Sequence, residues 1–172
     1  GIATMTLSAT DIDCSDVGAN PVVMTVSDNH GNSSTCSSVV TVLDTIAPVV
    51  LCQDTIISLD TDGKATIDTS FVYKGSTDAC GVADIWLSKS NFNGSNVGSN
   101  SITVLVSDLN GNVGTCTSIV TVMDTIAPEA RCKDIGITLD TAGRARIYPG
   151  FIDNGSTDEG GIVSYTLDKT RF

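Results

Sequence analysis

Acidic and amide side chains that could bind a metal ion recur at three places in the middle of the chain. Asp44 follows a run of apolar and β-branched residues, and Asp78 lies in a polar segment. Asp108, Asn110 and Asn112 share a Gly-containing turn. Carboxylate and amide oxygens are the ligands that Ca²⁺ prefers. If the fold brings the three segments to one end of a module, they form a calcium site. The alternative is that Asp and Asn occupy turns because their side chains bond the nearby backbone.

The same acidic pattern returns 80 residues later and predicts a second calcium site. Asp124 and Asp158 are the equivalents of Asp44 and Asp78, and the equivalent of the hairpin turn lies beyond Phe172. Calcium is the one cofactor that the sequence suggests. No residue pattern indicates an organic cofactor.

Both candidate sites lie at copies of one segment. The sequence Val-Thr-Val-Leu-Asp-Thr-Ile-Ala-Pro ends at Pro48, and it returns with Met in place of Leu to end at Pro128. Proline cannot donate to a β-ladder, and it holds the residue before it extended. We therefore interpret Asp44–Pro48 as a stiff joint between modules, called joint 1, and Asp124–Pro128 as its repeat, called joint 2.

Similarity at an 80-residue period covers the whole chain. Val-Ser-Asp ends at Asp28 and again at Asp108, and Gly-Ser-Thr-Asp ends at Asp78 and again at Asp158. Such a period marks tandem structural units. With boundaries at the joints, we predict the C-terminal half of one module at 1–46, a complete module at 47–126 and the N-terminal half of the next at 127–172. We expect a window of a longer array, in which neighbouring repeats of the same chain are the first partners.

Composition and apolar spacing predict an all-β fold. Only 5% of the residues are aromatic, and short β-branched runs alternate with Gly, Asn, Asp and Ser turns. In the complete module we expect a polar loop over 69–81, a change of sheet or a bulge near Asp54, and strands at 49–59, 65–68, 82–88, 101–107 and 114–123. Short strands with regular turn signals are typical of a sandwich. The predicted fold class is tandem immunoglobulin-like β-sandwich modules.

Charge and hydropathy exclude several classes of partner. The formal net charge of −11 disfavours nucleic acid and anionic membranes. No apolar run of about 18 residues is present, so we expect no membrane insertion in this segment.

We also predict that the chain is not an enzyme. The one histidine, His30, lies in a turn, and the next module carries Asn110 in its place. No nucleophile elbow or phosphate-binding loop is present.

The motifs of the complete module resemble the hyalin-type (HYR-like) repeats. They are Cys52-Gln-Asp, Leu59-Asp-Thr-Asp-Gly, Gly75-Ser-Thr-Asp-Ala-Cys-Gly, Val106-Ser-Asp-Leu-Asn-Gly-Asn with Thr115-Cys, and Asp124-Thr-Ile-Ala-Pro. Such repeats occur in very large secreted surface proteins of gliding and related Bacteroidota, including gliding-motility adhesins exported by type IX secretion. The resemblance implies a filament of tandem immunoglobulin-like modules that is located outside the cell, at the cell surface.

The function expected from this resemblance is that of a stalk. The chain would be a structural segment of a long secreted adhesin or filament, used for surface attachment or gliding. The alternative is a module that itself binds a carbohydrate or protein through the loop at 91–100, with surface glycans or other cell-surface proteins as partners.

Six cysteines at repeat-locked positions indicate disulfides and an oxidising location. In a sandwich of this type the first and last strands can lie parallel, which favours a Cys52–Cys116 bridge within the module. The rival pairing is Cys36–Cys52 across joint 1. By the same logic Cys36 and Cys132 have partners outside this window.

Cys14 and Cys80 are the remaining two cysteines, and neither is a cysteine in the next copy of the repeat. Their equivalents are Gly94 and Gly160. HYR-like modules often carry cysteines at both places, but the complete module has only one of the two. We therefore expect Cys80 to be a half-buried free thiol.

The resemblance also nominates sites for O-linked glycans. In the phylum to which it points, Asp followed by Thr and a small or aliphatic residue is similar to the acceptor signal. The candidates are Thr45, Thr55, Thr125 and Thr141. The alternative is that these threonines are ordinary strand and hinge residues.

Overall fold

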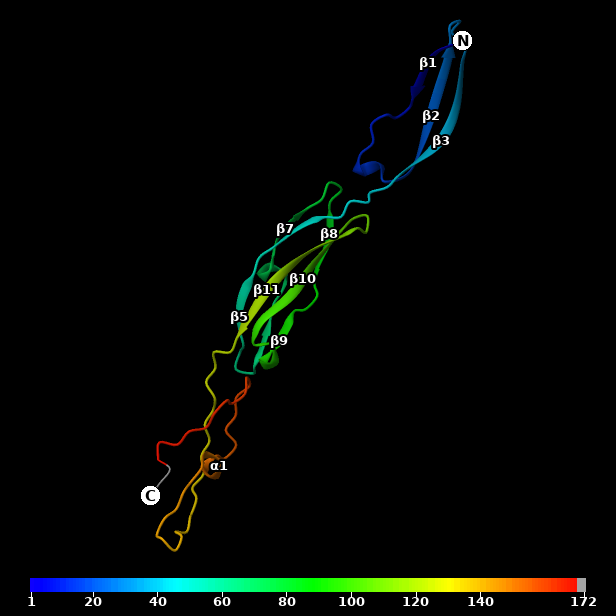
Figure 1. The fold of residues 1–172 in the computed structure, drawn as a ribbon. Coiled ribbons are helices and arrows are strands. Elements are labelled where there is room, and N and C mark those ends of the chain that lie inside the picture. The colour runs from blue at the N-terminus through cyan, green and yellow to red at the C-terminus, as the bar shows by residue number, and fades with distance from the viewer. Residues whose placement is uncertain (170–172) are drawn as a thin grey trace. The chain divides into compact units, whose positions relative to one another are not determined.

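The computed structural model describes residues 1–169, and its fold is all-β (Figure 1). Strands account for 47% of the chain and helices for 8%, which confirms the predicted class and is consistent with an immunoglobulin-like sandwich. The chain forms two compact units. Unit 1 comprises Gly1–Leu51, Gly75–Trp86 and Leu105–Cys116, and unit 2 comprises Cys52–Lys74, Leu87–Val104 and the chain from Thr117 onward. Joint 1 lies in unit 1 and joint 2 in unit 2. The module boundaries at the joints stay a prediction.

The first half-module is a three-stranded antiparallel sheet in the order β1-β2-β3. Its elements are β1 (Ile2–Leu7), the 3₁₀ helix η1 (Cys14–Asp16), β2 (Gly18–Asp28) and β3 (Ser33–Val42). Strands β2 and β3 pair from Gly18↔Val42 to Ser27↔Ser33. The turn between them closes on Asp28, whose Oδ1 accepts the N–H groups of His30 and Asn32.

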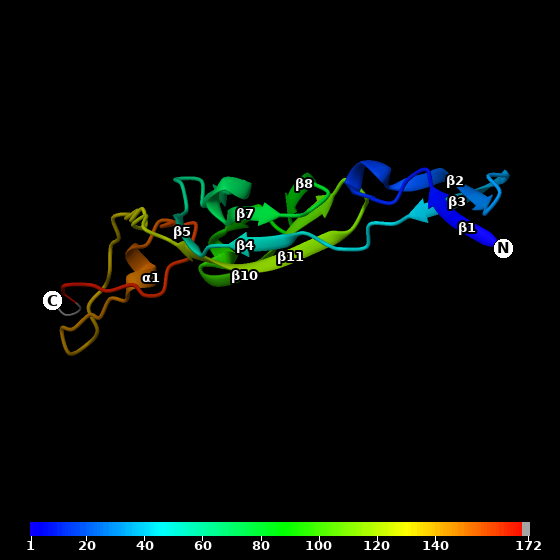
Figure 2. The same cartoon turned by 90° about the horizontal axis from the view of Figure 1, so that it is seen from above.

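The complete module contains three sheets. Figure 2 shows β4, β5, β7, β8, β10 and β11 of this module from above. The largest has the strand order β5-β11-β10-β8, and two smaller sheets pair β4 with β7 and β6 with β9. The elements are β4 (Val49–Cys52), β5 (Thr55–Ser58), β6 (Lys64–Thr66), η2 (Thr69–Phe71), β7 (Tyr73–Thr77), β8 (Val82–Leu87), β9 (Asn91–Asn93), η3 (Gly94–Asn96), β10 (Gly98–Asp108) and β11 (Val113–Met123).

Strand β5, the second part of the strand predicted at 49–59, pairs in parallel with the last strand of the module, β11, as expected. Val120 pairs with Thr55 and Val122 with Ile57. The chain changes sheets between β4 and β5, as predicted near Asp54. The carboxylate of Asp54 accepts the N–H of Ile119 at 2.8 Å. One residue earlier, the carbonyl of Gln53 accepts the fully buried hydroxyl of Ser118 at 2.7 Å. These bonds satisfy the polar groups that the change of sheet would otherwise leave without partners.

The core follows the alternation of β10 and β11. Ile102, Val104 and Val106 of β10 and Val120 and Val122 of β11 are at most 1% exposed. Each such side chain contributes roughly 1.5–3 kcal/mol relative to exposure. Other elements of the module contribute the buried residues Ile57, Leu59, Ile67, Val72 and Phe92.

The loop predicted over 69–81 is wrong, because it contains η2 and strand β7. Residues 73–77 read Tyr-Lys-Gly-Ser-Thr, in which Gly75 adopts φ 145°. Glycine and most polar residues do not favour strands, so the sequence pattern did not predict this one. Strand β7 forms because it pairs with β4.

The 80-residue period is also a structural period. Strand β8 repeats the position of β1, η3 that of η1 and β10 that of β2. The capping bonds repeat as well, since Asp13 and Asn93 accept the N–H groups of Ser15 and Ser95. Equivalent segments therefore fold in the same way because they contain the same local bonding groups.

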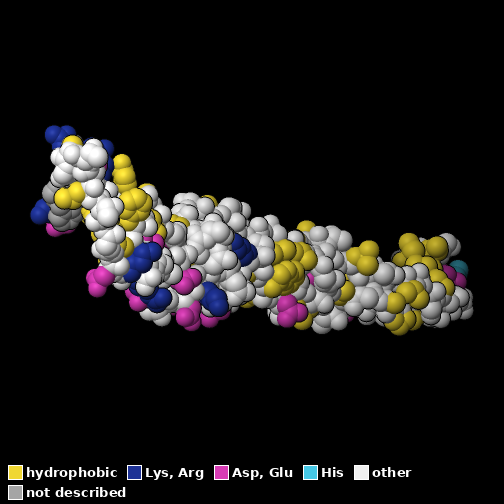
Figure 3. All heavy atoms as spheres, turned by 90° about the horizontal axis from the view of Figure 1, so that it is seen from below, with side chains coloured by type: hydrophobic (Ala, Val, Ile, Leu, Met, Phe, Trp, Pro, Cys, Tyr) yellow, Lys and Arg dark blue, Asp and Glu magenta, His cyan; other side chains and the backbone are white. Residues whose placement is uncertain are grey.

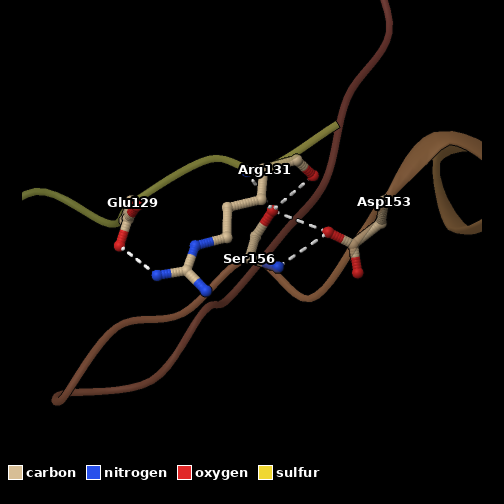
Figure 4. A network of polar contacts seen from close by, with 4 residues as sticks. All are labelled: Glu129, Arg131, Asp153 and Ser156. Atoms are coloured by element: carbon tan, nitrogen blue, oxygen red, sulfur yellow. Dashed lines mark hydrogen bonds and ion pairs between the residues drawn. The ribbon is translucent and has the colours of Figure 1, made fainter. Parts of the chain in front are cut away.

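In the last half-module, the residues up to 169 contain one short helix, α1 (Pro149–Ile152). Figure 4 shows the polar contacts beside it. Ser156 Oγ donates to Asp153 at 2.6 Å and accepts the N–H of Arg131 at 2.9 Å. The guanidinium of Arg131 contacts Glu129 at 2.8 Å in an exposed ion pair. Such an exposed pair contributes little to stability, because water screens the two charges.

Hydrophobic side chains are exposed on parts of the surface, as the yellow spheres in Figure 3 show. They include Val39 and Leu43 in the first half-module and Ile137 and Leu139 in the last. No helix within residues 1–169 is long and apolar enough to cross a membrane.

Candidate metal site at the module joint

Joint 1 brings together three carboxylates that are far apart in the sequence. Asp44, Asp78 and Asp108 each offer an oxygen atom, and these atoms lie within 4.8 Å of one another. All three residues belong to unit 1. Asp108 is 3% exposed, and Asp44 and Asp78 are half-buried. The three side chains come from the joint, the loop after β7 and the end of β10.

Asp108 is held by its own hairpin. Its Oδ1 accepts the N–H groups of Asn110 and Asn112 at 2.8 Å, and its Oδ2 accepts the side-chain amide of Asn112 at 2.7 Å. Burial raises the pKa of Asp108, but the amide and backbone donors of Asn112, with the N–H groups of Asn110 and Gly111, outweigh it. The pKa therefore lies below its usual value, and the carboxylate is charged at neutral pH.

Asn110 and Asn112, the two asparagines predicted as possible ligands, form hydrogen bonds in the hairpin. Asn112 Nδ2 donates to Asp108 and also, at 3.2 Å, to the backbone carbonyl of Asp44. Asn110 contributes its backbone N–H. The side-chain amide of Asn112 therefore connects the hairpin to joint 1, and a ligand role for the amide oxygens stays a prediction. The donors suit Asp108, because a buried carboxylate needs hydrogen-bond donors nearby.

One oxygen of the cluster lacks a partner. Asp44 Oδ1 accepts the N–H of Ile46 at 3.0 Å, but Asp44 Oδ2 is inaccessible to solvent and has no hydrogen-bond partner within residues 1–169. An unsatisfied buried acceptor costs about 1–3 kcal/mol. A cation among three carboxylates would remove this cost, so the donor set fits an oxygen-liganded ion such as Ca²⁺.

Joint 2 repeats the local bonds of joint 1. Asp124 Oδ1 accepts the N–H of Ile126 at 3.1 Å, and Asp158 Oδ1 accepts the N–H of Gly160 at 2.9 Å. A Cβ atom on Gly160 would collide with Asp124 Oδ2 and would lie 3.3 Å from Asp158 Oδ1. The two predicted carboxylates therefore converge on Gly160.

The expectation of a free Cys80 thiol is wrong. Cys80 is bonded to Cys14, at a sequence separation of 66 and with an S–S distance of 2.02 Å. The bond therefore joins the first half-module to the complete module across joint 1. The sequence argument failed because it sought the partner of Cys80 within the same module.

The other cysteines fall into two groups. Both Cys52 and Cys116 are disulfide-bonded, which the predicted bridge between them requires. Cys36 and Cys132 carry exposed free thiols in this chain, so the rival Cys36–Cys52 bridge is not formed.

The remaining candidate residues lie mostly at the surface. Thr45, Thr125 and Thr141 are exposed, and Thr55 is half-buried in β5. In the segment at 91–100, the side chain of Asn100 donates to the carbonyl of Asn96, while that of Asn93 caps η3. These amides therefore stabilise their own turn.

Residues 43–122 match the HYR domain. The matched segment begins at joint 1 and ends near the end of β11. The HYR domain is a non-enzymatic, adhesion-type domain found in extracellular proteins. No curated protein matches the chain. The disulfides fit an extracellular protein.

Proposed function

We propose that the chain is a stalk segment of a long secreted adhesin or filament at the cell surface, used for surface attachment or gliding. The observation that carries the proposal is the Cys14–Cys80 bond, which crosses joint 1. A covalent bond between consecutive modules serves transmission of force along an array, and a module that acted alone would have no use for it. The HYR match at residues 43–122 supports an adhesion-type setting.

Pulling single molecules of the array, with and without reductant, tests the stalk. Between Cys14 and Cys80 lie 66 residue steps that the bond excludes from extension. At about 3.3–3.6 Å per residue, reduction should add at least roughly 220 Å to the extended length, because it also opens the disulfide bonds of Cys52 and Cys116. Equal lengths in both buffers would contradict the proposal. The Cys36→Ser/Cys132→Ser variant is a matched control, because it removes two free thiols and should behave as the unmodified chain.

We propose calcium as the ligand of the Asp44, Asp78 and Asp108 cluster. The support is the convergence of three carboxylates and the partnerless Oδ2 of Asp44. An ion bound there would contact the joint and two loops of the following module. It would therefore stabilise the ordered joint by mass action.

O-linked glycans at Thr45, Thr55, Thr125 and Thr141 are proposed for the native protein. Exposure of three of the four threonines supports access by a transferase. The intact mass of native material, compared with recombinant chain, tests this. Added mass on the two Asp-Thr-Ile-Ala-Pro peptides is expected, and unmodified peptides would remove the proposal.

The second candidate function is ligand binding by the segment at 91–100. Its asparagines are engaged in their own turn, and its Gly94 lies against the backbone of Glu159. We therefore place the stalk first. Binding of a glycan by the isolated segment on a glycan array would reverse this order.

A further inference from the structure

The positions joined by the Cys14–Cys80 bond occur twice in the chain with different residues. Their equivalents 80 residues later are Gly94 and Gly160. In each pair the first residue begins a short 3₁₀ helix before the joint, η1 or η3. The second lies after the joint, directly before a glycine with positive φ, Gly81 or Gly161. Both members of the pair change together, from two cysteines at joint 1 to two glycines at joint 2.

The glycine pair is also in contact. A Cβ atom on Gly94 would collide with the carbonyl oxygen of Glu159 and would lie 3.3 Å from the Cα of Gly160. A Cβ on Gly160 would collide with Asp124. The two loops therefore meet at joint 2 as backbone against backbone, an approach that glycine permits. Joint 2 has the same loop contact as joint 1 but no covalent bond.

We propose that this pair of positions sets how readily each joint opens. The bond clamps joint 1, and the glycine contact makes joint 2 the joint that opens first. The physical reason is the closed loop, because Asp44–Pro48 lies inside the segment bounded by Cys14 and Cys80, whose Cα atoms stay 5.2 Å apart. Joint 2 is held only by non-covalent contacts, which each opening event can break and reform.

Such an array has two kinds of joint, and the residues at these two positions specify which kind each joint is. The proposal extends the stalk function but does not depend on it. Any tandem array of these modules would bend and open first at its glycine joints.

The chain contains its own matched probes for this difference. Both joints read Asp-Thr-Ile-Ala-Pro, so the chemical exchange rates of their amides are closely similar. The N–H of Ile46 donates to Asp44 at 3.0 Å, and that of Ile126 donates to Asp124 at 3.1 Å. A difference in their hydrogen exchange therefore reports how often each joint opens.

The experiment is hydrogen exchange on the full chain. We expect the N–H of Ile126 to exchange at least about ten times faster than that of Ile46, which corresponds to about 1.4 kcal/mol. In the Cys14→Ser/Cys80→Ser variant the Ile46 rate should rise towards that of Ile126, while the Ile126 rate should stay the same. The Cys36→Ser/Cys132→Ser variant, which removes two free thiols, should leave the ratio unchanged.

Equal rates at Ile46 and Ile126 in the unmodified chain would overturn the proposal, and so would an Ile46 rate that does not change when the Cys14–Cys80 bond is lost. The core amides of Val104 and Val106 report whether the variant is folded. Failure here would leave a stalk with uniform joints, whereas equal extension with and without reductant would remove the stalk itself.

Discussion

Joint 1 and joint 2 have the same sequence, but different residues surround them. At joint 1, Pro48 is buried, and its carbonyl lies so close to Gly114 that a Cβ atom there would collide with it. Asn112 donates to the backbone of Asp44, and the Cys14–Cys80 bond spans the joint. At joint 2, glycines occupy the positions of both cysteines, and the equivalent of the Asn112 hairpin lies beyond Phe172. Identical local segments can therefore differ in stability, because most of what holds a joint comes from residues distant in sequence.

The hydrogen bonds within the two joints are the same. In each joint the aspartate accepts the N–H two residues later, at 3.0 Å and 3.1 Å. These bonds set the extended path of the chain through the joint. The contacts that surround them are what the following experiments remove.

The largest effect is expected from the bond across joint 1. The Cys14→Ser/Cys80→Ser variant should lower the free energy of unfolding of unit 1 by about 4 kcal/mol, the loop-closure value for 66 residues. Urea unfolding of the variant and the unmodified chain measures this. The Cys36→Ser/Cys132→Ser variant should unfold at the unmodified midpoint. A midpoint unchanged by loss of the bond would mean that joint 1 does not depend on it.

The next effect concerns the contact of Gly114 with joint 1. A methyl group from Gly114→Ala would meet the carbonyl oxygen of Pro48 and lie 3.1 Å from Val50 Cγ2. Such overpacking costs about 1–3 kcal/mol. The control is Gly136→Ala, where nothing lies within 4 Å and little change in the thermal midpoint is expected. Equal midpoints for both variants would show that the joint 1 backbone moves aside without cost.

Calcium should stabilise joint 1 by a smaller amount. At a free concentration ten times its Kd, an ion that binds only the folded chain adds about 1.4 kcal/mol. The thermal midpoint should rise with Ca²⁺ and return with chelator. Asp44→Asn should abolish the rise, because it removes a carboxylate from the cluster. Asp28→Asn should keep the rise, because Asp28 forms the same kind of hairpin outside the cluster. If the thermal midpoint does not change with Ca²⁺, the cluster does not bind this ion.

The smallest effect is expected from acid. The pKa of Asp108 in the folded chain is lowered from 3.8, so its ionised form contributes stability above that value. This contribution is lost as the pH falls through the lower folded pKa. Asp108→Asn should lower the thermal midpoint at pH 7 and reduce the fall in acid. Midpoints followed from pH 7 to about pH 2 measure this, and parallel curves for the variant and the unmodified chain would exclude Asp108 as a contributor.

The periodicity of the sequence was sufficient to predict the repeated strands and their buried side chains. Alternating residues in β10 and β11 bury Ile102, Val104 and Val120 as the pattern predicts. The change of sheet near Asp54 was also predictable. Ile57 and Leu59 occupy odd-numbered positions on one face of a strand, whereas Cys52 falls on the opposite face. Such features are local, because a strand buries every second side chain wherever it lies.

Other features were missed because their cause is not local. Strand β7 contains a glycine and polar residues, and it exists through pairing with β4. The Cys14–Cys80 bond joins two modules, so a comparison of positions within one module could not find it. The sequence did contain a signal for this bond. At the equivalent positions Gly94 and Gly160 replace both cysteines together, as expected for two cysteines that pair with each other.

The sequence alone determined the period, the all-β class and the residue types that could bind calcium. Each of these depends on spacing along the chain or on short-range backbone preferences. Only the tertiary structure decided which cysteine meets Cys80, that Asn112 donates to both Asp108 and joint 1, and that one oxygen of Asp44 lacks a partner within residues 1–169. Those outcomes depend on segments brought together from opposite sides of a joint, and the spacing along the chain does not specify which atoms then meet.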